Sequence, residues 1–236
     1  MYVLWKRASD SDAAFVASLR DDVAKRMLDL GTPALSLNLV DDTARSVQQA
    51  RLTRLDPPPS GTLSIWLDAA EDRVPYEALL APATDRLAGY LVVESVPLRN
   101  TKHPVPVGER TPGINMVALL ERPVRLTWEA WIDYWHGPHR QVAFETQCTF
   151  RYVRNVVVRA LTEGAPPWAG IVEEGFPTEA VTDPMRWYCA DGSVETMQAN
   201  LARMIESCKR FLDLERVESH PTSEYCMAEF APTEAR

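Results

Sequence analysis

Two histidines three residues apart, His136 and His139, carry side chains suited to proton transfer near neutral pH. Gly137 and Pro138 stand between them, although the surrounding sequence follows a helical pattern. Proline has no N–H to donate to the carbonyl of Tyr134 and crowds that carbonyl, so we expect the helix to kink or unwind here. A carbonyl freed in this way would fix the tautomer of a nearby imidazole and leave its other nitrogen for a ligand.

The same helix, for which Thr127 is the expected N-cap, carries an apolar stripe that includes Trp131 and Trp135. His139 falls on this stripe and His136 lies at its edge. Two interpretations are open: the stripe is the wall of a substrate site with His139 as its acid–base group, or it is packed core in which His139 is a buried histidine with a backbone partner. A metal site is disfavoured, because helical metal pairs are commonly four residues apart and no third ligand is evident. We therefore predict no bound metal.

Two strands after the helix carry the other candidates, and their alternation divides the polar residues between two faces. Tyr152 and Arg154 share one face of the first strand, and Asn155 lies on the other. Glu173 and Glu174 are adjacent in the second strand, so only one of them can face a given site. Tyr152 is placed to donate to a developing enolate, and one glutamate to orient the imidazole or act as the partner acid. The alternatives are a packed tyrosine, an arginine in a salt bridge and solvated or paired glutamates.

The order of elements predicts the fold that positions these residues. Residues 1–98 follow the order strand, helix, strand, strand, helix, strand, and residues 113–236 repeat the order without a residue-level repeat. Residues 99–112 are polar, contain three prolines and form the clearest linker. This is the order of a ferredoxin-like unit, whose open sheet face must be covered. We therefore predict an α+β fold of two tandem ferredoxin-like βαββαβ units, packed sheet to sheet as a pseudo-dimeric α/β barrel.

The composition limits the partners. With 236 residues, 46% of them hydrophobic, the chain can bury a sizeable core. Its net charge of −8 disfavours nucleic acid or an anionic membrane surface as a partner, and no apolar run approaches a membrane span. The four cysteines form no CxxC pair and no zinc-ligand spacing with a histidine, so we predict four free thiols and a cytoplasmic location. His103 in the linker and His220 before the last strand are predicted to lie at the surface.

The helix motif resembles the EthD domain family. The signature of that family is an aromatic residue, a tryptophan four residues later and a histidine four residues after that. Trp131, Trp135 and His139 match these positions. The resemblance covers roughly residues 114–230, through further short motifs at residues 151–155, 171–176 and 210–213.

The sequence departs from the family pattern at three positions. Gln141 stands where the family usually has a proline, and the Gly-Pro pair comes earlier, after His136. It therefore stays open whether His136 or His139 takes the family role. Val156 stands where a histidine is often found, and Arg154 where glutamine is common.

The resemblance implies a dimeric α/β-barrel fold and a cofactor-free enzyme of aromatic or polyketide metabolism. We expect a lyase, dehydratase or cyclase that acts by histidine acid–base catalysis on a small hydrophobic, aromatic or polyketide-like substrate. A cofactor-free monooxygenase on an aromatic substrate and a non-catalytic small-molecule-binding or assembly protein are the alternatives. A monomer and a homodimer both stay open. The residues assigned to the site are, for catalysis, His139, His136, Tyr152, Glu173 and Glu174 and, for substrate binding, Trp131, Trp135, Arg154 and Asn155.

Overall fold

A computed structural model describes residues 1–230, and they form a barrel of eight antiparallel strands. Each strand pairs with two neighbours, in the order β1-β3-β2-β8-β5-β7-β6-β4, so the barrel is closed. The predicted α+β fold class is confirmed. The strands are β1 (Tyr2–Trp5), β2 (Leu35–Leu39), β3 (Gly61–Ile65), β4 (Arg86–Leu98), β5 (Ile114–Leu120), β6 (Arg151–Ala160), β7 (Gly170–Phe176) and β8 (Glu218–Ala228).

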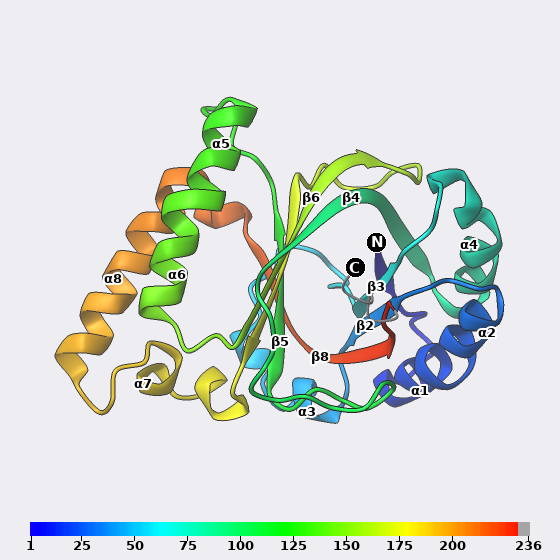
Figure 1. Cartoon of the computed structure of the whole chain (residues 1–236), viewed down its shortest axis with the longest axis horizontal. Helices are drawn as coiled ribbons and strands as arrows, with labels where there is room; N and C mark the ends of the chain where they lie inside the picture. The colour runs from blue at the N-terminus through cyan, green and yellow to red at the C-terminus, as the bar shows by residue number, and fades with distance from the viewer. Residues whose placement is uncertain (231–236) are drawn as a thin grey trace, which may run out of the picture.

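The longer helices lie outside the barrel in two groups, one on either side of it (Figure 1). In the first group, Phe15, Leu19 and Met27 pack on strand residues such as Leu37 and Leu63. No helix in residues 1–230 is both long and apolar enough to cross a membrane. The α-helices are α1 (Asp12–Ala17), α2 (Ala24–Asp29), α3 (Asp42–Arg45), α4 (Val74–Leu80), α5 (Trp128–Tyr134), α6 (Arg140–Thr146), α7 (Pro184–Trp187) and α8 (Val194–Phe211).

Two of these helix pairs are joined through a π-helical turn. The expected unwinding near Pro138 is present as a π-helix over Trp135–His139, between α5 and α6. A second π-helix, Ser18–Val23, joins α1 to α2 in the first half, and this segment contains no proline. π-Helical turns are rare and frequent at functional sites. The chain therefore has the same interruption in the first helix of each half, once with proline and once without.

Closure of the barrel decides which polar side chains are enclosed. Strand β2 pairs with β8 and β4 pairs with β6, so the two halves of the chain close one sheet. In β2 the leucines face the helices, whereas Asn38 faces the barrel interior and is only 1% exposed. The polar face of an alternating strand is therefore buried here, because the sheet closes on itself.

The position of His220 corrects the prediction that it lies at the surface. Strand β8 begins at Glu218, earlier than its sequence indicates, and pairs His220 with Val117 of β5. His220 is 2% exposed. His103 is half-buried, with its ring 4.6 Å from that of Phe150.

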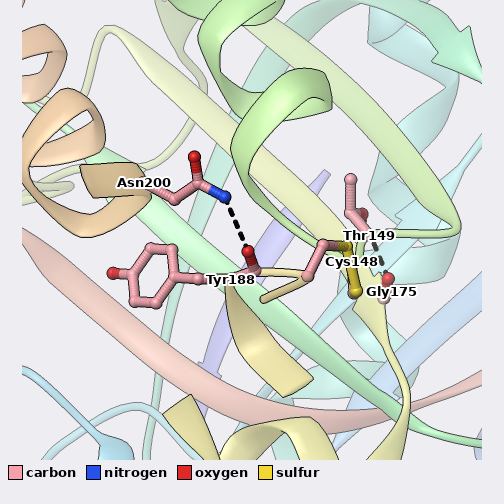
Figure 2. Close-up of a disulfide and its surroundings, with 6 residues drawn as sticks. Cys148, Thr149, Gly175, Tyr188 and Asn200 are labelled. Carbon is pink, nitrogen blue, oxygen red and sulfur yellow. Dashed lines mark hydrogen bonds between the residues drawn. A yellow bond between two sulfur atoms is a disulfide. The ribbon is translucent and has the colours of Figure 1, made fainter. Parts of the chain in front are cut away.

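A disulfide joins Cys148 to Cys189, with their Cα atoms 5.3 Å apart (Figure 2). The prediction of four free thiols is therefore wrong for this pair, whereas Cys208 and Cys226 are free. The two bonded cysteines are 41 positions apart in the sequence, and only the fold brings them together.

The bridge fastens the segment after α7 to the start of β6. Close by, Asn200 of α8 donates to the carbonyl of Tyr188 at 2.8 Å, and Thr149 donates to the carbonyl of Gly175 at 3.0 Å (Figure 2). The bridge therefore lies beside the end of β7, one of the strands that carry the candidate site.

Loss of this bridge is expected to destabilise the fold. Cys148→Ser with Cys189→Ser should lower the free energy of unfolding by up to about 4 kcal/mol, because a cross-link over this length restricts the unfolded chain. Denaturant titration of the double variant measures the loss. Cys208→Ser with Cys226→Ser is the control, and it should cost less because those thiols are unbonded. Equal stability of the two double variants would contradict a bridge in solution.

Candidate functional site

The tryptophan stripe of α5 and the π-helix is packed against the sheet. Trp131 and Trp135 are both 0% exposed, and their ring centroids are 4.9 Å apart. Thr127 accepts from the backbone N–H of Ala130, as expected for the N-cap. Both rings pack over Gly170 of β7, where a Cβ atom would lie 2.6 Å from Trp135. These tryptophans therefore form core between helix and sheet.

His139 is enclosed between its own helix and α8. Its Nδ1 lies 3.0 Å from the hydroxyl of Ser207, and its ring centroid lies 4.3 Å from that of Phe211. Burial lowers the pKa of His139 to about 4, so its imidazole is neutral at pH 7. The sequence did not indicate Ser207, since a serine on an amphipathic helix is usually solvated. The contact engages Nδ1 and leaves Nε2 for a ligand.

His136 is half-buried at the edge of the stripe. Its Nε2 is enclosed and has no hydrogen-bond partner among residues 1–230. The backbone carbonyl of His136, next to Pro138, accepts from Arg154 at 3.3 Å, and Arg154 also donates to Ser95. Burial, followed by the charges of Arg154 and Arg140, lowers the pKa of His136 to about 4. Arg154 therefore holds the π-helix in place from the strand side.

Tyr152 and Glu174 are directly opposite each other on β6 and β7, on the face toward the helices. Trp135 donates from its indole to the phenol oxygen of Tyr152 at 3.2 Å. Glu174 keeps some exposed surface, but its Oε1 is enclosed without a hydrogen-bond partner in residues 1–230. Burial raises the pKa of Glu174 to about 8. It also raises the pKa of Tyr152, with a further contribution from Glu174.

The sequence-predicted residues therefore separate into two sets. We call His139, Tyr152 and Glu174 the helix-side group, because they lie between the sheet and the α5–α6 and α8 helices. It contains a neutral imidazole, a phenol and a carboxyl that is mostly protonated at pH 7. The imidazole can accept a proton while the carboxyl donates one, and this paired transfer leaves the net charge of the protein unchanged. Glu173 and Asn155 lie on the other face, inside the barrel.

The barrel interior holds a polar network around Glu173. Asn155 and Asn38 donate to the two carboxylate oxygens of Glu173 at 3.0 and 3.2 Å. Arg151 lies 3.2 Å from Glu173 and 2.6 Å from Glu224. Polar and apolar residues alternate along β2, β6 and β8. In a closed barrel the polar faces of these strands point inward, so the predicted barrel together with this alternation is the signal in the sequence for the network. The residues join strands from both halves of the chain, so the network spans the closure of the barrel.

A cavity of about 360 Å³ opens at one end of this interior. Asn155, Tyr90, Ser64 and Glu94 contribute to its lining. Desolvation and the charge of Glu173 raise the pKa of Glu94, which is exposed at the rim. Of the substrate-binding candidates, Asn155 alone lines this cavity. A small molecule can be accommodated in this cavity.

The contact between Gly170 and the tryptophans gives a test of the packing. Gly170→Ala should lower the free energy of unfolding by about 1–3 kcal/mol, because the new methyl group meets two enclosed rings. Gly137→Ala is the matched control, since nothing lies within 4 Å of its Cβ position. It should be neutral or stabilising by up to about 1 kcal/mol. Thermal unfolding compares the two, and equal melting temperatures would contradict the packing of Trp135 on Gly170.

Residues 1–230 contain no group of three or more His, Cys, Asp or Glu side chains arranged to hold a metal ion.

Comparison with known proteins finds one similar structure and no similar sequence. No family model matches the sequence, and no curated protein matches it. A solved structure, described as a crystal structure study of an anthrone oxidase-like protein, is similar over 100% of this chain and 94% of its own, with a TM-score of 0.52 and 11% sequence identity. At this identity the likeness shows the fold alone.

Proposed function

We propose that this protein is an enzyme that moves protons on a hydrophobic aromatic or polyketide-like small molecule, in the manner of a lyase, dehydratase or cyclase. The observation that carries the proposal is the carboxyl of Glu174, whose Oε1 is enclosed without a partner and whose pKa is raised to about 8. An unsatisfied buried carboxyl costs stability, and such groups concentrate at functional sites. Glu174 keeps some exposed surface, and a substrate would approach its carboxyl from that side.

In a dehydration, the three residues of the helix-side group would act as base, hydrogen-bond donor to the enolate and acid. His139, held through Nδ1 by Ser207, takes a proton at Nε2 from an activated carbon of the substrate. The phenol of Tyr152 donates to the enolate oxygen that forms, since its own oxygen already accepts from Trp135. Protonated Glu174 gives its proton to the leaving hydroxyl, which departs as water. The proton on His139 then returns to Glu174 through solvent, and the enzyme is restored.

A cofactor-free monooxygenase is the second candidate, and the fold shared with an anthrone oxidase-like protein favours it. It would begin with the same proton abstraction, after which molecular oxygen reacts with the electron-rich anion. Anthrone is the direct probe: one anthrone and one O₂ would give one anthraquinone and one water. Oxygen uptake with anthrone would select this candidate, and turnover of hydroxylated polyketide-like substrates without oxygen uptake would select the lyase. A binding or assembly role would be selected if His139→Ala left ligand affinity and biological activity unchanged.

The architecture supports a proposal about origin. We infer that residues 1–98 and 113–236 are two ferredoxin-like units of a pseudo-dimeric barrel, and that the second belongs with the EthD domain family. The strand orders β4-β1-β3-β2 and β8-β5-β7-β6 are equivalent, and the first helix of each unit contains a π-helix.

A cytoplasmic location stays a prediction, and the disulfide argues against it because reducing compartments rarely preserve such bonds. Thiol titration of protein taken from its native compartment tests the location.

Three glutamate variants test the assignment of the chemistry. Glu174→Gln should lower kcat/KM roughly 10²- to 10⁴-fold, as expected for loss of a positioned acid. Glu163→Gln, at an exposed glutamate in a loop, is the control and should leave the rate unchanged. Glu94→Gln reports on the barrel cavity. A loss confined to Glu94→Gln would move the chemistry into the barrel and overturn the proposal.

A further inference from the structure

A second cavity, of about 480 Å³, lies where β1 ends at Trp5. Trp5 and the prolines at residues 57–59 give it an apolar wall, and Arg51 and Gln48 give it polar groups. None of these residues belongs to the helix-side group or to the barrel cavity that Asn155 lines.

Arg51 is a polar group of this cavity that leaves hydrogen-bonding capacity unused. Its Nε is enclosed without a hydrogen-bond partner among residues 1–230, and the same holds for Oε1 of Gln48. Burial lowers the pKa of Arg51, and Asp12 offsets this only in part. A guanidinium cannot shed its charge at any pH that a protein meets, so it requires an acceptor. The described residues give Nε no acceptor, and Arg51 lines the cavity.

The residues beneath Arg51 do not neutralise it. His220 is 2% exposed, and burial together with the charge of Arg51 lowers its pKa to about 3, so it is neutral. Glu218 lies 3.3 Å from His220, and its negative charge is paired with the Arg54 side chain at 3.8 Å. The acidic group that acts on Arg51 is Asp12. The guanidinium of Arg51 therefore faces the cavity with its charge available.

The acidic residues of the cavity limit the charge of the ligand. Asp12 lies 3.6 Å from Lys6 and 3.7 Å from Arg45, so its charge is balanced. Asp85 lies at the exposed rim and repels a multiply charged anion. The cavity favours a single negative charge at Arg51, with an apolar body beyond it.

We propose that this cavity is a binding site for an aromatic carboxylate. The carboxylate accepts from the guanidinium of Arg51, which matches its planar geometry. The ring lies against Trp5 and the prolines, and Gln48 Oε1 accepts from a hydroxyl on the ring where one is present. The same chain thereby has a place for an acidic aromatic compound apart from its proposed reaction site.

Benzoate is the probe, and its binding to the full chain is measured by NMR titration with the Trp5 indole N–H as reporter. Benzoate should bind, and Arg51→Met should weaken binding at least tenfold, a loss of about 1.4 kcal/mol. Arg26→Met is the matched control, because Arg26 is exposed and pairs with Asp22 at the surface at 3.6 Å, and it should leave affinity unchanged. Thermal unfolding of each variant establishes that it is folded.

Three results would overturn the site. They are benzoate binding that Arg51→Met does not weaken, equal binding of the neutral amide benzamide, and tighter binding of inorganic phosphate than of benzoate. Each is a binding result and needs no turnover. The benzoate-binding test is therefore independent of the glutamate variants that test the proposed reaction.

Discussion

Glu174→Gln is expected to abolish most of the activity while it makes the protein more stable at alkaline pH. The carboxyl has a pKa of about 8 in the folded protein against 4.5 in its ordinary state. The folded state therefore keeps a proton that the unfolded state has already lost between these values. Stability falls as pH rises through that window and is constant above about pH 8. The glutamine variant lacks this loss and should be more stable at pH 9 by roughly 2–5 kcal/mol.

Kinetics and unfolding measure the two halves of this expectation. In the wild type, kcat/KM should be greatest between about pH 4 and pH 8, where His139 is neutral and Glu174 is protonated. The residual activity of Glu174→Gln should lose the decline above pH 8. Guanidinium titrations at pH 5 and pH 9 should show a stability gain at pH 9 that is nearly absent at pH 5. A variant that is less stable at pH 9 would mean that Glu174 is a structural residue with partners in solution.

Arg151→Met is expected to be the most destabilising single change in the barrel interior. Arg151 joins Glu173 of β7 to Glu224 of β8, and all three side chains are largely enclosed. Removing the cation leaves two buried carboxylates near each other, which typically costs about 3–5 kcal/mol. The loss should be smaller at acidic pH, because burial raises the pKa of Glu224 and favours its neutral form there. Denaturant titration at pH 5 and pH 8 measures both effects.

Arg159→Met is the matched control on the same strand. Arg159 is exposed and lies 3.9 Å from Glu71 at the surface, so its removal should cost less than about 1 kcal/mol. Adding Glu173→Gln to Arg151→Met should recover part of the loss, because one of the stranded charges is gone. If Arg151→Met and Arg159→Met cost the same, the interior network does not hold the barrel together.

Local rules predicted the helix and the faces of the strands. Proline chemistry predicted the interruption at Pro138, and period-two alternation correctly placed Tyr152 with Arg154 and put Asn155 on the opposite face. The same alternation showed that Glu173 and Glu174 must separate. The fold then identified Glu174 as the one that faces the helices.

Contacts between distant segments could not be predicted in this way. Ser207 approaches His139 only because α8 packs on the π-helix, and Cys148 meets Cys189 only through the fold. Barrel closure had a larger effect, because it encloses faces that an open sheet would leave solvated. Asn38 and His220 therefore look like surface residues in the sequence and are buried in the structure.

The proposed chemistry requires that Glu174 is held as a neutral acid at pH 7, and infrared spectroscopy tests this protonation state most directly. A difference spectrum between the wild type and Glu174→Gln isolates the carboxyl band as pH is varied. The expected result is a protonated C=O stretch at pH 7 that disappears with a midpoint near pH 8. A midpoint near 4.5, with only a carboxylate band at pH 7, would contradict the claim and remove the proposed acid from the site.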